Sequence, residues 1–102
     1  MLKYLQNESQ NYFKTHTYSE VFATLSTPRQ RTNFYTMLVA SHLTSTTEAA
    51  VTYLGESSAA HSIDAGALMS ALWGLSLQVG ASSEEAKRLT ALVGLLHARS
   101  IV

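Results

Sequence analysis

No stretch of the chain shows the alternating apolar and polar residues, with runs of β-branched side chains, that are typical of a strand. Capping residues and glycines instead separate segments of helical character. The connections between these segments are two to five residues long, so successive helices are expected to be antiparallel neighbours. We therefore predict an all-α fold in which the whole chain, 1–102, is a single helical domain. The six predicted helices span about 2–15, 18–25, 28–43, 46–57, 63–79 and 83–99.

Most of the predicted helices begin with a capping box, in which Ser or Thr is followed three residues later by Glu or Gln. The side chains of such a pair accept hydrogen bonds from backbone N–H groups that the first helical turn leaves unpaired. Pro28, the only proline, fits the first helical position after Thr27. A weaker start is Ser62 with Asp64, and Gly80 suits the end of the fifth helix. The four boxes are Thr17–Glu20, Thr27–Gln30, Ser45–Glu48 and Ser82–Glu85.

A shift of 34 residues superposes the third predicted helix on the fifth, with apolar or small residues matched along one face. A 34-residue period of helix–turn–helix units resembles the tetratricopeptide repeat. Trp73-Gly74 stands where that family has its Leu-Gly pair, and Ala86 follows Gly74 by the family's twelve-residue step. We therefore predict two similar hairpins, 28–57 and 63–99. The matched pairs are Phe34 with Leu68, Leu38 with Leu72, Val39 with Trp73, Ala40 with Gly74 and Leu43 with Leu77.

The small residues in this alignment predict points of close approach between paired helices. A side chain larger than that of Ala40 or Gly74 would push such helices apart. Both residues are therefore expected to be almost fully buried.

The fifth predicted helix is apolar around nearly its whole circumference, whereas a helix that buries one stripe has a polar face opposite. Such a helix either lies at the centre of a bundle or meets a second molecule with its other face. In a two-layer solenoid, the first helices of the two hairpins would form an apolar trough that accepts an amphipathic helix. The candidate partner-binding residues are Phe34, Met37 and Ser41 from the third helix and Leu68, Ala71 and Leu75 from the fifth.

Charge is scarce along this chain. Charged residues make up only 14%, against roughly 25% in an average domain, which favours a buried partner surface or a homo-oligomer. Seven basic and seven acidic residues balance without a basic block, which argues against nucleic-acid binding. The absence of cysteine excludes disulfides, a thiolate nucleophile and a Cys-based zinc site, and it favours the cytosol.

Neither a leader nor a membrane span is expected. The N-terminal residues 1–8 turn polar at once and contain no apolar core of a signal peptide. The longest uncharged stretch, 65–83, contains polar residues and three glycines, so we interpret it as a buried helix. We expect a cytoplasmic protein.

Candidate catalytic and metal-binding groups are few. The four histidines, His16, His42, His61 and His97, pair with no other residue at metal-ligand spacing. Most acidic residues fall in first helical turns, where capping explains them. Motifs for phosphate binding, dinucleotide binding and a nucleophile elbow are absent. We therefore expect no enzymatic activity, no metal and no cofactor.

Two alternatives to a helix-binding adaptor stay open at this stage. Residues 46–57 have a faint helix-turn-helix character, but the segment that follows, 58–66, contains no cation to contact DNA. A small helical DNA-binding regulator is therefore the less favoured alternative. A self-associating structural bundle is the other, because it also needs an exposed apolar surface.

Two tetratricopeptide-like hairpins and an apolar trough in a small all-α chain resemble the co-chaperones of the type III secretion needle subunit. The resemblance covers 32–92 and includes 37–43 and 72–80 followed by 83–89. It implies a cytosolic chaperone whose trough holds the C-terminal amphipathic helix of the needle protein and keeps that protein from polymerising. It also implies a second partner, a small helical co-chaperone. Without a partner, the chain is expected to aggregate or to form a homodimer.

Overall fold

The structure is a computed structural model that describes residues 2–43, 48–59, 63–79 and 84–101. Across these ranges the chain forms six helices and no strand, which confirms the predicted all-α fold. Each end of a predicted helix lies within two residues of the observed end. The helices are α1 (Leu2–Phe13), α2 (Tyr18–Ala23), α3 (Pro28–Ser41), α4 (Glu48–Ala59), α5 (Ala65–Gln78) and α6 (Glu84–Ala98).

Capping boxes start α2 and α3 as the sequence predicts. Thr17 Oγ1 accepts a hydrogen bond from the backbone N–H of Glu20, whose carboxylate accepts one from the N–H of Thr17 at 2.9 Å. Thr27 and Gln30 form the same reciprocal pair, with Pro28 at the start of the helix. Local side-chain chemistry therefore decides where these two helices begin.

At α5 the cap is Asp64. Its Oδ1 atom accepts a hydrogen bond from the backbone N–H of Ala67 at 3.0 Å. Asp64 thus caps α5, as its place in the predicted pair with Ser62 suggested. The predicted features that lie outside the described residues are Ser62, the serines of the boxes Ser45–Glu48 and Ser82–Glu85, and Gly80.

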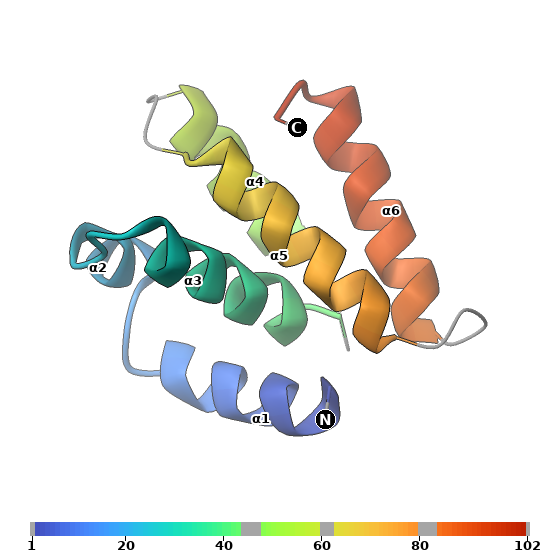
Figure 1. Ribbon diagram of the computed structural model, residues 1–102, viewed down its shortest axis with the longest axis horizontal. Coiled ribbons are helices and arrows are strands. Elements are labelled where there is room, and N and C mark those ends of the chain that lie inside the picture. The colour runs from blue at the N-terminus through green and yellow to red at the C-terminus, as the bar shows by residue number, and fades with distance from the viewer. Residues whose placement is uncertain (1, 44–47, 60–62, 80–83, 102) are drawn as a thin grey trace.

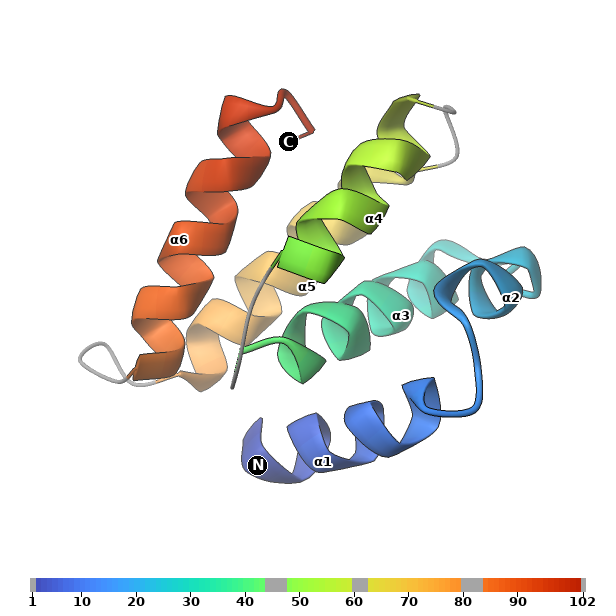
Figure 2. The ribbon, with the colours of Figure 1, turned by 180° about the vertical axis from the view of Figure 1, so that it is seen from behind.

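The helices are arranged around a central pair, α3 and α5. These two pack on each other most extensively, α1 packs on α3, and α6 contacts both α4 and α5. Figures 1 and 2 show α1 and α2 on one side of this pair and α6 on the other, with α4 behind α5 in Figure 1 and in front of it in Figure 2. Arg88 of α6 also reaches the end of α3, where its Nη1 atom donates to the carbonyl oxygen of Leu43 at 2.8 Å. The division into two similar hairpins, 28–57 and 63–99, stays a prediction.

The hydrophobic core is centred where α3 meets α5, and it includes side chains of α4 and α6 and Ile101 near the C-terminus. Ala40 is fully buried in this core, as predicted. Gly74 is not: it is partly exposed, and a Cβ atom added to it would have no heavy atom within 4 Å. The prediction of a close helix approach at Gly74 is therefore wrong, because none of the described helices packs against that point of α5.

Candidate functional site

The six candidate partner-binding residues do not line an open trough, because five of them are buried. The three residues of α5 are buried, as are Phe34 and Ser41 of α3, which are in contact with Phe13 and Gln10 of α1. The buried residues are Phe34, Ser41, Leu68, Ala71 and Leu75, and Met37 is half-buried. The structure thus shows a closed core where a trough was expected. A partner-binding role for these six side chains stays a prediction.

The opposite face of α5 carries an exposed apolar row. Met69, Trp73 and Leu77 follow one another at intervals of four residues, which places them along one side of the helix. Their exposed fractions are 51%, 69% and 71%. The helix contains no charged residue, so no charge interrupts or flanks this row on α5. We call these three side chains the α5 stripe.

Two contacts at the start of α5 help to set which face of the helix points outward. Asp64 Oδ2 accepts a hydrogen bond from Arg31 Nε at 2.6 Å, and the backbone N–H of Asp64 donates to the hydroxyl of Tyr35 at 3.1 Å. The hydrogen bond from the N–H of Ala67, and then the guanidinium of Arg31, lower the pKa of Asp64, which keeps it ionised. Arg31 and Tyr35 both belong to α3. The start of α5 is therefore tied to α3, and the α5 stripe lies on the face that the core does not use.

Sequence reasoning missed the α5 stripe because the repeat alignment gave two of its residues buried counterparts. Trp73 was matched with Val39 and Leu77 with Leu43, yet Val39 and Leu43 are fully buried whereas Trp73 and Leu77 are exposed. The available signal was the apolar character of α5 on all sides, which indicated a second face but not which residues form it.

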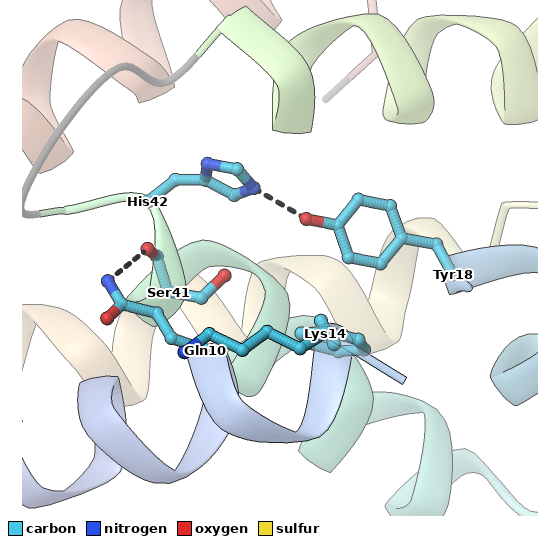
Figure 3. A pocket seen from close by; sticks show the side chains of 6 residues that line it. Gln10, Lys14, Tyr18, Ser41 and His42 are labelled. Atoms are coloured by element: carbon cyan, nitrogen blue, oxygen red, sulfur yellow. Dashed lines mark hydrogen bonds between the residues drawn. The ribbon is translucent and has the colours of Figure 1, made fainter. Parts of the chain in front are cut away.

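A pocket of about 250 Å³, lined mostly by polar residues, lies between α1, α2 and the end of α3 (Figure 3). Tyr18 Oη and His42 Nε2 are hydrogen-bonded at 2.6 Å, and Gln10 Nε2 donates to the carbonyl oxygen of Ser41 at 3.1 Å. Burial raises the pKa of Tyr18, so its hydroxyl stays protonated at neutral pH. These hydrogen bonds connect α1 and α2 to the end of α3. The lining consists of Gln10, Phe13, Lys14, Tyr18, Ser41 and His42.

A second pocket, of about 340 Å³, opens between α1, α2 and the first half of α3. Its lining is mainly apolar and includes Phe34 and Met37, two of the candidate partner-binding residues. Tyr12 of α1, Val21 of α2 and Leu25 of the following turn form the other apolar walls. This volume is at the lower end of the range for ligand pockets and also accommodates an apolar side chain.

Comparison with protein-family models, with curated proteins and with solved structures gives no match. Within the described residues, no group of three or more His, Asp or Glu side chains is placed to hold a metal ion. In the same part of the chain, every helix is too short or too polar to cross a membrane.

Proposed function

We propose that this chain is a protein-binding module that docks another protein on the α5 stripe. The observation that carries the proposal is the exposure of Met69, Trp73 and Leu77 in one line on an uncharged helix. Single exposed apolar residues are common on soluble proteins and need no explanation. A contiguous row of large ones is uncommon and usually marks an interface.

The geometry of the α5 stripe favours an amphipathic helix as the partner. Side chains four residues apart form a ridge along a helix, and such ridges pack into the grooves of a second helix. Burying each large apolar side chain contributes about 1.5–3 kcal/mol before the costs of association are subtracted. Trp73 lies in the middle of the row, and tryptophan is among the residues most enriched at binding hot spots. The partner's facing side chains are expected to be apolar and uncharged.

The resemblance to needle-subunit co-chaperones makes a secreted helical subunit the first partner to test. In that case the chain acts as a chaperone, with the α5 stripe as the surface that holds the partner's amphipathic helix. Self-association through the same stripe is the second candidate, because a chain of zero net charge does not repel a second copy. DNA binding is less favoured, since α5 offers no cation to a phosphate.

A charge placed in the α5 stripe tests the proposal without disturbing the core. Leu77→Asp changes an exposed side chain, so the fold should be kept while an apolar partner is lost. The matched control is Thr90→Asp, because Thr90 is exposed on α6 on the side away from its buried Leu89 and Leu92. The wild-type chain and both variants are tagged and purified from the native host, and the bound proteins are quantified by mass spectrometry.

The proposal predicts a protein that the wild type and Thr90→Asp retain equally and that Leu77→Asp loses by about tenfold or more. If the chain instead associates with itself, light scattering should show a dimer for the wild type and Thr90→Asp and a monomer for Leu77→Asp. Equal retention by all three chains, with no change in mass, would contradict the proposal.

A further inference from the structure

The face of α1 that packs on α3 is polar at its centre. Gln6 is 2% exposed and Ser9 is fully buried, yet Gln6 Nε2 and Ser9 Oγ form no hydrogen bond with any described residue. A buried polar group without a partner loses its hydration and gains nothing in return, so native structures contain few of them. The desolvation of these two groups therefore opposes the packing of α1 on α3.

A ring contact and a side-chain hydrogen bond join the C-terminal half of α1 to α3. The ring of Phe13 lies edge-on to that of Phe34, with 6.0 Å between centroids, and Gln10 donates to the carbonyl oxygen of Ser41. Figures 1 and 2 both show α1 at the margin of the molecule, where it lies against α3 and apart from α5 and α6. Detachment of α1 would therefore leave the packing of α3 on α5 in place.

The surface beneath α1 is part of the expected partner-binding site. Phe34, Met37 and Ser41 succeed one another at intervals of three and four residues, so they share one face of α3. The apolar pocket of about 340 Å³ opens on this face beside Tyr12 of α1, and Phe34 and Met37 line it. Part of the face is thus open even while α1 is in place.

We infer that α1 is a displaceable cover and that the α3 face beneath it is a second binding surface for an amphipathic helix of another protein. Such a helix presents apolar side chains where α1 places Gln6 and Ser9, and it packs a further one beside Met37, against the pocket walls formed by Val21 and Leu25. It removes the unpaired polar groups from the contact, which α1 cannot do. This surface is separate from the α5 stripe, so either proposal can fail without the other.

Hydrogen exchange of the full chain tests whether α1 opens on its own. In the wild type, amides of α1 should exchange much faster than those in the middle of α3. Gln6→Leu combined with Ser9→Ala removes both unpaired groups and should slow exchange in α1 by about tenfold or more, with α3 unchanged. Asn7→Leu with Glu8→Ala is the matched control at exposed positions of the same helix and should not slow it. The inference is overturned if wild-type α1 is as protected as α3, or if both double variants behave alike.

A peptide tests the surface itself. The probe is a synthetic, fluorescently labelled copy of residues 2–13 that carries Gln6→Leu and Ser9→Ala. Its anisotropy should show binding to the wild-type chain, and it should speed exchange in the chain's own α1. Its affinity for the full-length double variant Gln6→Leu, Ser9→Ala should be lower by at least about tenfold, because α1 of that variant detaches less often from α3.

Two results of the peptide experiment would overturn the inference. One is equal affinity, or no binding, for the wild type and the double variant. The other is a change in Trp73 emission without faster exchange in α1, which would place the peptide on the α5 stripe instead. Trp73 is the only tryptophan, so its emission reports that stripe alone.

Discussion

Arg31 of α3 and Asp64, the residue that caps α5, form an ion pair with 2.6 Å between Nε and Oδ2. The same carboxylate accepts the backbone N–H of Ala67 through its other oxygen. One side chain thus starts α5 and joins it to α3. The pKa of Asp64 is lowered because both contacts favour its ionised form.

Asp64→Asn should lower the free energy of unfolding at neutral pH and have less effect in acid. Asparagine still caps a helix but loses the ion pair, so we expect a loss of about 0.5–1 kcal/mol at neutral pH for this partly exposed pair. Because the folded-state pKa lies below the unfolded value of about 3.9, the charged form stabilises the fold above that pH. The contribution is lost as the pH falls through the folded-state pKa.

Urea unfolding of the wild type and Asp64→Asn, at neutral pH and near pH 2, measures this difference. The other carboxylates are the same in both chains, so the difference in unfolding free energy between the wild type and the variant reports Asp64. A difference that is equally large at both pH values would contradict the role assigned to the ion pair.

The starts of the helices could be predicted from sequence because they depend on neighbours along the chain. The boxes Thr17–Glu20 and Thr27–Gln30 act within a single turn, and both formed as expected. The outward face of α5 could not be predicted in this way. An apolar helix without a polar side has no periodicity to orient it, and here its orientation depends on packing against α3 and on the distant partner Arg31.

The buried face of α1 also escaped sequence reasoning. Gln6 and Ser9 are polar and would ordinarily be exposed, but the contact with α3 buries them. The absence of the expected open trough has a related cause. Leu68 and Leu75 were predicted to face a partner helix from outside, whereas α3 of the same chain occupies that place.

Leu75 and Leu77 offer a direct comparison between the two faces of α5. Leu75 is fully buried and Leu77 is 71% exposed, on the same helix and with the same side chain. Leu75→Asp buries a charge without a partner and should destabilise the chain by several kcal/mol, enough to unfold it. Leu77→Asp should cost only about 1 kcal/mol, from lower helix propensity and a negative charge in the last turn of α5. Circular dichroism melting curves distinguish the two, and a folded, helical Leu75→Asp chain would favour the trough over the core.

Gly74→Ala should stabilise the protein. A glycine inside a helix costs about 0.5–1 kcal/mol relative to alanine, and the added methyl group meets no heavy atom within 4 Å. We therefore expect a higher free energy of unfolding by that amount in urea titrations. Destabilisation would mean that a neighbouring helix approaches Gly74 closely, as the repeat alignment had predicted.

Photo-crosslinking from the α5 stripe tests the central claim, protein binding on this surface, most directly. A photoreactive phenylalanine derivative replaces Leu77 in one chain and Thr90 of α6 in a second, and both chains are irradiated in cells of the native host. Because only position 77 lies in the α5 stripe, the account predicts a discrete crosslinked product from that chain and none from the other. Mass spectrometry then identifies the product as a partner protein or a second copy. No product from position 77, or the same products from both positions, would contradict the account.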